Sequence, residues 1–139
     1  MTPEEARSRF AWAPIARLAT VGANGAPHVV PITFAMDGDR IISAVDAKQK
    51  RGTALRRLAN ITSHPRVSVL VDHYQDDWQH LWWVRADGLA RIVADGHELE
   101  RAFDLLRDRY EQYRHVALIG PVVVVDVDRW TGWSAAPLD

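Results

Sequence analysis

Short β-type runs separated by tight turn signals dominate this chain and restrict it to folds built mainly from antiparallel strands. Asn24-Gly25, the strongest hairpin signal in the sequence, lies between two apolar runs. Asp37-Gly38 turns the chain into a third run. Strands joined by such short turns are antiparallel neighbours, so we expect a mostly antiparallel sheet.

The remaining runs raise the expected strand count to six or seven. The run at 27–35 carries Pro31, which has no N–H, so we expect this strand to be bulged or unpaired there. Within the long run at 81–93, Asp87-Gly88 predicts either a hairpin turn or a β-bulge. The continuous apolar run at 122–127 predicts a strand buried on both faces, and Trp130 to Trp133 should end the ordered chain.

Two or three helices are predicted around these strands. The first begins at Thr2 and ends before Pro14, and a short second helix opens at Gly52-Thr53. The third should begin with a capping box formed by Asp95 and Glu98. Its apolar face is Leu99, Ala102, Phe103, Leu106, Tyr110 and Tyr113. We therefore predict a mostly β fold, a single barrel domain over 1–139 with peripheral helices.

A cationic stretch at 48–57 is the clearest candidate for a binding site. It holds five of the 17 basic residues of the chain and no acidic residue. Such a cluster is a candidate anion site, and the alternative is a solvated helix start. The net charge of the whole chain is only −1, so we expect no general attraction to nucleic acid or to an anionic membrane.

Other patterns narrow the class of protein. The sequence has no Cys, and its first residues lack the apolar core of a signal peptide, so we expect a cytoplasmic protein. Its six His residues show no metal-ligand spacing, and neither a serine-hydrolase elbow nor a P-loop is present. Six Trp residues exceed the needs of a small core. These features suit a protein that binds a cofactor with a flat ring and an anionic tail, where the cofactor does the chemistry.

Several segments carry a family resemblance in their order and spacing. They are residues 16–22, 24–34, 41–44, 58–61, 64–71 and 83–90. With them the chain resembles the FMN-binding split-barrel superfamily of the pyridoxamine 5'-phosphate oxidases. It is most similar to the actinobacterial branch that uses the deazaflavin coenzyme F420. The resemblance implies a six-stranded antiparallel split β-barrel and a homodimer with two cofactor sites at its interface.

The resemblance also implies which residues bind the cofactor. The ring would lie along His28, Val29, Val30, Pro31, Ile32 and Thr33, with further contacts at Ser43 and Ala44. The anionic tail would be held within Lys48, Gln49, Lys50, Arg51, Arg56 and Arg57. Depending on the alignment, Lys50 or Arg57 is the main phosphate ligand. The facing subunit would contribute His80, Trp82 and Trp83.

The implied activity is hydride transfer from reduced F420 to a small or planar organic acceptor. Five clustered cations suit F420, whose phosphate is followed by several glutamates, better than FMN with its single phosphate. Two alternatives remain: an FMN-dependent enzyme, and a non-catalytic barrel that binds a flavin or a tetrapyrrole. Trp82 and Trp83 should face opposite ways, while Arg85 either reaches the tail or pairs with Asp87.

Overall fold

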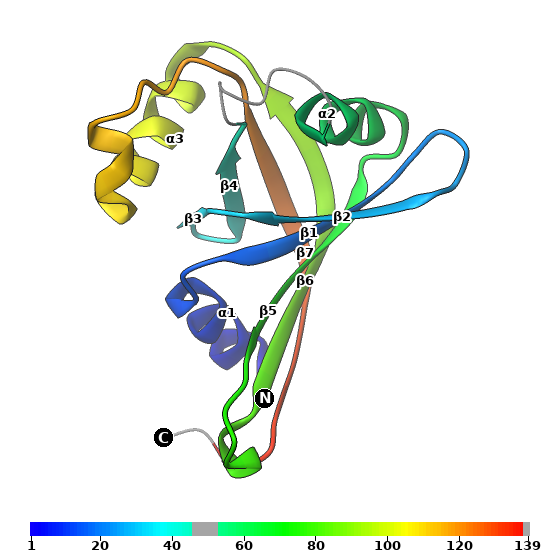
Figure 1. Cartoon of the computed structure of the whole chain (residues 1–139), viewed down its shortest axis with the longest axis vertical. Helices are drawn as coiled ribbons and strands as arrows, with labels where there is room; N and C mark the ends of the chain where they lie inside the picture. Colours follow the sequence, from blue (N-terminus) through cyan, green and yellow to red (C-terminus); the bar gives the residue numbers. More distant parts are fainter. Residues whose placement is uncertain (46–52, 138–139) are drawn as a thin grey trace.

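The computed structural model describes residues 1–45 and 53–137 and contains a single curled sheet with three α-helices around it (Figure 1). The strands are β1 (Ala16–Val21), β2 (Pro27–Ile32), β3 (Ala35–Asp37), β4 (Arg40–Ala44), β5 (Arg66–His73), β6 (Trp82–Val93) and β7 (Val122–Ser134). The helices are α1 (Pro3–Trp12), α2 (Thr53–Ser63), α3 (Gly96–Arg109) and the short 3₁₀ turns η2 (Trp78–His80) and η3 (Glu111–Arg114). No helix in this part of the chain is long and apolar enough to cross a membrane.

All neighbouring strands pair antiparallel, in the order β2-β1-β5-β6-β7-β4-β3. The two edge strands, β2 and β3, are consecutive in the chain and are joined only by Thr33 and Phe34. A flat sheet of this width would separate its edges by roughly 29 Å, whereas this link reaches roughly 11 Å. The sheet must therefore curl into a split barrel, as the sequence predicted.

The strand count is seven, which agrees with the six or seven expected from the runs and is one more than the six that the resemblance implied. The predicted strand over 27–35 is broken into β2 and β3, which lie on opposite edges of the sheet. Pro31 lies opposite Arg17 in an unshifted register, so the expected bulge or loss of pairing is wrong. An edge strand tolerates proline because one of its sides has no partner strand.

Asp87-Gly88 lies at a β-bulge and not at a hairpin turn. Asp87 lies opposite Arg129, but Gly88 lies opposite Val127, so Asp128 is the extra residue of β7. β6 continues past this point to Val93 without turning. Trp130 and Trp133 belong to the same long pairing, and β7 ends at Ser134, directly after the segment that was expected to end the ordered chain.

The main core fills the barrel. Strand residues alternate between this core and the outer face, so Trp82, Val84 and Ala86 of β6 are buried while Trp83 and Arg85 face outward. α1 closes one end of the barrel through Phe10, which is fully buried. Its ring meets Phe34 at 5.0 Å and Trp130 at 5.3 Å, both edge to face.

A second core lies under α3, on the outer side of β4 and β7. Ala102 and Leu106 of α3 pack there against Val122 and Val124, while Val123 and Val125 belong to the main core. The prediction that this run is buried on both faces is thus confirmed. Tyr110 and Tyr113 also pack there although α3 ends at Arg109. The Tyr110 hydroxyl donates to the Pro14 carbonyl at 2.8 Å.

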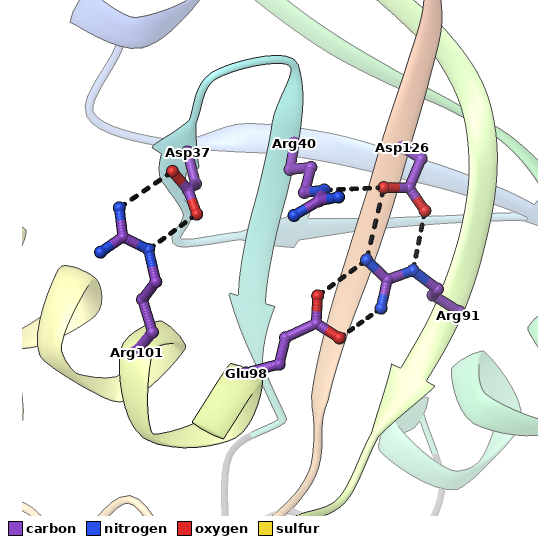
Figure 2. A network of polar contacts seen from close by, with 6 residues as sticks. All are labelled: Asp37, Arg40, Arg91, Glu98, Arg101 and Asp126. Atoms are coloured by element: carbon purple, nitrogen blue, oxygen red, sulfur yellow. Dashed lines mark hydrogen bonds and ion pairs between the residues drawn. The ribbon is translucent and has the colours of Figure 1, made fainter. Parts of the chain in front are cut away.

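Ion pairs fix α3 against the sheet (Figure 2). Arg91 of β6 contacts Glu98 and lies 2.7 Å from Asp126 of β7, and Arg101 binds Asp37 at 3.0 Å. These contacts lower the pKa values of Glu98, Asp126 and Asp37, chiefly through hydrogen bonds from the arginines. The expected capping box is therefore wrong. Asp95 caps α3 without a side-chain hydrogen bond. Glu98, whose carboxylate would complete the box, binds Arg91 instead.

Candidate ligand-binding site

A buried polar cluster lies where α2 packs on β1. The side chain of Asn60 donates to the Thr20 hydroxyl at 3.0 Å, and both residues are buried. Arg57 is one helical turn before Asn60, on the same side of α2, and is only 6% exposed. Thr20 lies opposite His28 of β2, so these two side chains share one face of the sheet. Four polar residues thus gather at this end of the barrel.

Two atoms of this cluster lack hydrogen-bond partners among the described residues. They are Nε of Arg57 and Nδ1 of His28, both buried. Burial also lowers the pKa of the Arg57 guanidinium, because the charged form has lost hydration. A buried cation with an open donor costs free energy unless an anion accepts from it. An anionic group bound at this end of the barrel would satisfy both the charge and the donor.

An apolar groove of about 690 Å³ lies on the outer face of the sheet. Its wall includes Val29, Leu70, Trp83 and Trp133. Three of these side chains are unusually exposed for apolar residues: Val29 by 62%, Leu70 by 36% and Trp133 by 47%. A patch of this kind is typical of a surface that binds a ligand or another protein.

Ion pairs lie around this groove. Arg17 of β1 binds Asp72 of β5 at 3.3 Å, and Arg85 binds Asp87 at 3.2 Å. Arg85 was expected either to reach the anionic tail or to pair with Asp87, and the structure contains the ion pair. The centre of the groove is therefore apolar, and its charges are compensated within the chain.

A comparison with protein-family models matches residues 2–134 to the pyridoxamine 5'-phosphate oxidase family. The match covers nearly the whole chain, and the curled antiparallel sheet agrees with it. The chain belongs to the pyridoxamine 5'-phosphate oxidase family. This confirms the resemblance read from the sequence at the level of the family.

Among curated proteins, this family member is similar to a 5a,11a-dehydrotetracycline/5a,11a-dehydrooxytetracycline reductase of Streptomyces rimosus. The two are 38% identical over 56 residues, a segment that covers 40% of this chain and 38% of the reductase. The match therefore spans well under half of that relative.

Several solved structures share the fold of this family member. A conserved hypothetical protein of Mycobacterium tuberculosis, Rv2991, has a TM-score of 0.79 and 23% identity, covering 97% of this chain and 86% of that one. A heme binding protein of Mycobacterium smegmatis has a TM-score of 0.73 and 20% identity, covering 96% and 57%. A FAD binding protein of M. smegmatis has a TM-score of 0.65 and 20% identity, covering 96% of each chain.

The structure separates the predicted ring-binding residues of β2 by face. Val30 and Ile32 point into the core, so they could meet a ligand only through their main chain. Val29 lines the outer groove. Thr33 follows β2, and its carbonyl accepts from the Ser43 hydroxyl at 2.8 Å, which links the segment after edge strand β2 to β4.

The other predicted residues fall in three places. Ala44 ends β4, beside Ser43, and Arg56 is exposed on α2 next to buried Arg57. Trp83 faces outward into the groove while Trp82 is buried at its border, so the two face opposite ways as predicted, and His80 lies 3.5 Å from Asp77. Four predicted tail ligands, Lys48, Gln49, Lys50 and Arg51, lie outside the described residues.

Sequence reasoning missed part of the groove. Arg17, Leu70 and Asp72 line it, yet they looked like ordinary strand residues. The signal that could have found them is the register of the strands. Arg17 lies opposite Leu70, Leu70 opposite Arg85, and Trp83 opposite Trp133. These pairings bring outward-facing residues of β1, β5, β6 and β7 together. Trp133, which the sequence placed only at the end of the ordered chain, also lies in the groove.

Proposed function

We propose that this protein is a cytoplasmic oxidoreductase that binds reduced F420 and passes hydride to a small or planar organic acceptor. The observation that carries the proposal is the buried Arg57 guanidinium, whose Nε lacks a partner among the described residues. It lies a few residues after the basic segment 48–51, so several cations of one stretch could meet a polyanionic tail.

β2 offers a path for a ligand with two ends. His28 faces Thr20 at the polar end under α2, and the next residue, Val29, lines the apolar groove. A flat ring could lie against the free edge of β2 while its anionic tail reaches Arg57. The chain's residues would bind and orient the cofactor, and the bound deazaflavin would supply the hydride. No side chain here is assigned as proton donor.

The relative from S. rimosus, named as a reductase, supports an oxidoreductase. Two alternatives have support of their own. FMN would also satisfy Arg57 through its single phosphate. A non-catalytic barrel is favoured by fold neighbours named as heme binding and FAD binding proteins. The number of clustered cations, five in the stretch 48–57, favours the longer polyanion of F420 over FMN.

A turnover assay tests the enzymatic part of this proposal. The protein is mixed with reduced F420 and a panel of planar conjugated acceptors, and reoxidation of the cofactor is followed by its absorbance. We expect reoxidation that depends on both the protein and an acceptor. Cofactor that binds but is never reoxidised faster than in buffer would instead support the non-catalytic barrel.

We also propose that two copies of the chain form a homodimer through the outer face of the sheet. Val29, Leu70, Leu89 and Trp133 all point outward from it and are at least 36% exposed. Monomeric proteins rarely leave so many large apolar side chains exposed on one face. In a symmetric dimer the same patch covers itself, and the groove becomes an enclosed site.

Sedimentation velocity at micromolar concentration should show a dimer. Leu70→Asp should weaken dimerisation at least about tenfold, because it places a charge at the centre of the buried patch. Ile119→Asp is the matched control, because Ile119 is also exposed, by 67%, but follows η3 rather than lying in the sheet. A monomeric parent protein, or equal effects of the two changes, would contradict the proposed interface.

A further inference from the structure

A second pocket of about 420 Å³ opens between the end of α1 and the ends of β5 and β6. Its lining includes Arg9 and Trp12 from α1, His73 from β5, and His80 and Trp82 at the start of β6. Arg9 and Trp12 belong to neither the proposed tail site nor the outer groove. The volume is within the range of small-molecule sites.

Three aromatic rings form one side of this pocket. The His73 ring is stacked with the Trp82 ring, with centroids 6.1 Å apart and an angle of 15°. Trp12 meets both of them edge to face, at 6.0 Å from Trp82 and 6.2 Å from His73. Trp12, the last residue of α1, is 63% exposed, whereas Ala6 and Phe10 form the buried face of this helix. Its open ring face gives a planar ligand a surface on which to stack.

In the part of the chain that the structure describes, the lining of this pocket carries positive charge and no carboxylate. The Arg9 guanidinium lies over the Trp82 ring, 5.6 Å from its centroid, and forms no ion pair among the described residues. Among the described residues no Asp or Glu lines the pocket, and the ion pair of a lining residue there is that of His80 with Asp77. An arginine that lies over an indole face without an ion-pair partner keeps its N–H donors available for a carboxylate or an enolate.

We propose that this pocket binds a planar conjugated anion, with its ring against Trp12 and its negative group on Arg9. The pocket shares His73, Leu81 and Trp82 with the outer groove, so the two sites adjoin. If the proposed function holds, this is the acceptor site, and the acceptor class is a planar carboxylate or enolate. Binding itself does not rest on that function, because Arg9 and Trp12, which would hold the anion and its ring, are not among the predicted cofactor residues.

Calorimetric titration of the cofactor-free protein with 2-naphthoate, a planar anion, tests the proposal directly. Its neutral analogue 2-naphthamide and the non-planar cyclohexanecarboxylate are the comparison probes. We expect 2-naphthoate to bind more tightly than either. Arg9→Gln should weaken 2-naphthoate binding at least about tenfold and remove its advantage over 2-naphthamide. Trp12→Leu should weaken binding of both naphthalene probes.

Arg7→Gln is the matched control, because Arg7 lies on the same helix but pairs with Asp39 at 3.1 Å, away from the pocket. It should bind 2-naphthoate as the parent protein does, and circular dichroism should show all three variants folded. The proposal is overturned if the parent protein does not bind 2-naphthoate at millimolar concentration, or if Arg9→Gln and Arg7→Gln behave alike. Because no F420 or FMN is present, this result is independent of which cofactor the protein uses.

Discussion

Arg57→Met should weaken F420 binding by about 1.5–3 kcal/mol, or roughly 10- to 150-fold in Kd, the range for a hydrogen bond to a charged group. Without ligand, the same change should leave the free energy of unfolding equal or higher. The reason is that Arg57 is buried, its pKa is lowered by desolvation, and its Nε has no partner among the described residues. If Arg57 instead stabilised the fold, its replacement would lower the free energy of unfolding together with the affinity for the cofactor.

The two effects can be measured separately, by fluorescence titration of the cofactor and by urea unfolding of the cofactor-free protein. Arg101→Met is the charge-matched control: it removes an exposed arginine that pairs with Asp37 on the far side of the sheet. It should leave cofactor binding unchanged. Lys50→Met, compared with Arg57→Met, tells which of the two is the main phosphate ligand. Unchanged F420 affinity in Arg57→Met would remove the proposed tail site.

Gly88→Ala should lower the free energy of unfolding by about 3 kcal/mol and the Tm by about 10 °C. Gly88 lies at the bulge, where β6 and β7 approach closely. A Cβ there would press against the Asp126 carbonyl oxygen and lie 2.9 Å from the Val127 Cα. Both are main-chain atoms of the neighbouring strand, so relief requires the two longest strands of the barrel to separate.

Gly25→Ala is the comparison, because Gly25 has a positive φ of 83° but open space around its Cα. Its cost comes only from the left-handed backbone conformation, about 1 kcal/mol. In thermal unfolding, the Tm of Gly88→Ala should therefore be well below that of Gly25→Ala. The reverse ranking would mean that the strands can adjust at the bulge, and that its close approach does not constrain the barrel.

Local signals predicted most of the fold. Asn24-Gly25 forms the β1–β2 hairpin, with Gly25 at positive φ and the Asn24 side chain accepting from the Ala26 N–H. Thr2 and Glu5 form the capping box of α1. Both motifs act within a few residues, where sequence reasoning is strongest. The capping box at Asp95 and Glu98 failed because Arg91 of the preceding strand β6 binds Glu98 instead, a contact that a local capping signal does not include.

The site was harder to predict because it depends on contacts between distant segments. Sequence placed Arg57 in a cationic stretch but could not show that it is buried beside Asn60 while Arg56 is exposed. Likewise, Trp12 looked like the end of a helix. Only the packing of α1 across the barrel brings it to Trp82. Charge patterns indicate that an anion site exists, and tertiary packing decides which cation is desolvated.

Titration of the cofactor-free protein with F420 and, in parallel, with FMN tests the central claim most directly. Both ligands change fluorescence when they bind, so their Kd values can be compared at one salt concentration. The account predicts that F420 binds at least about tenfold more tightly, because its glutamates add charge-assisted contacts to the cationic stretch. That advantage should shrink at high salt, as screening weakens the extra contacts. FMN binding as tight as F420, or tighter, would contradict the cofactor assignment.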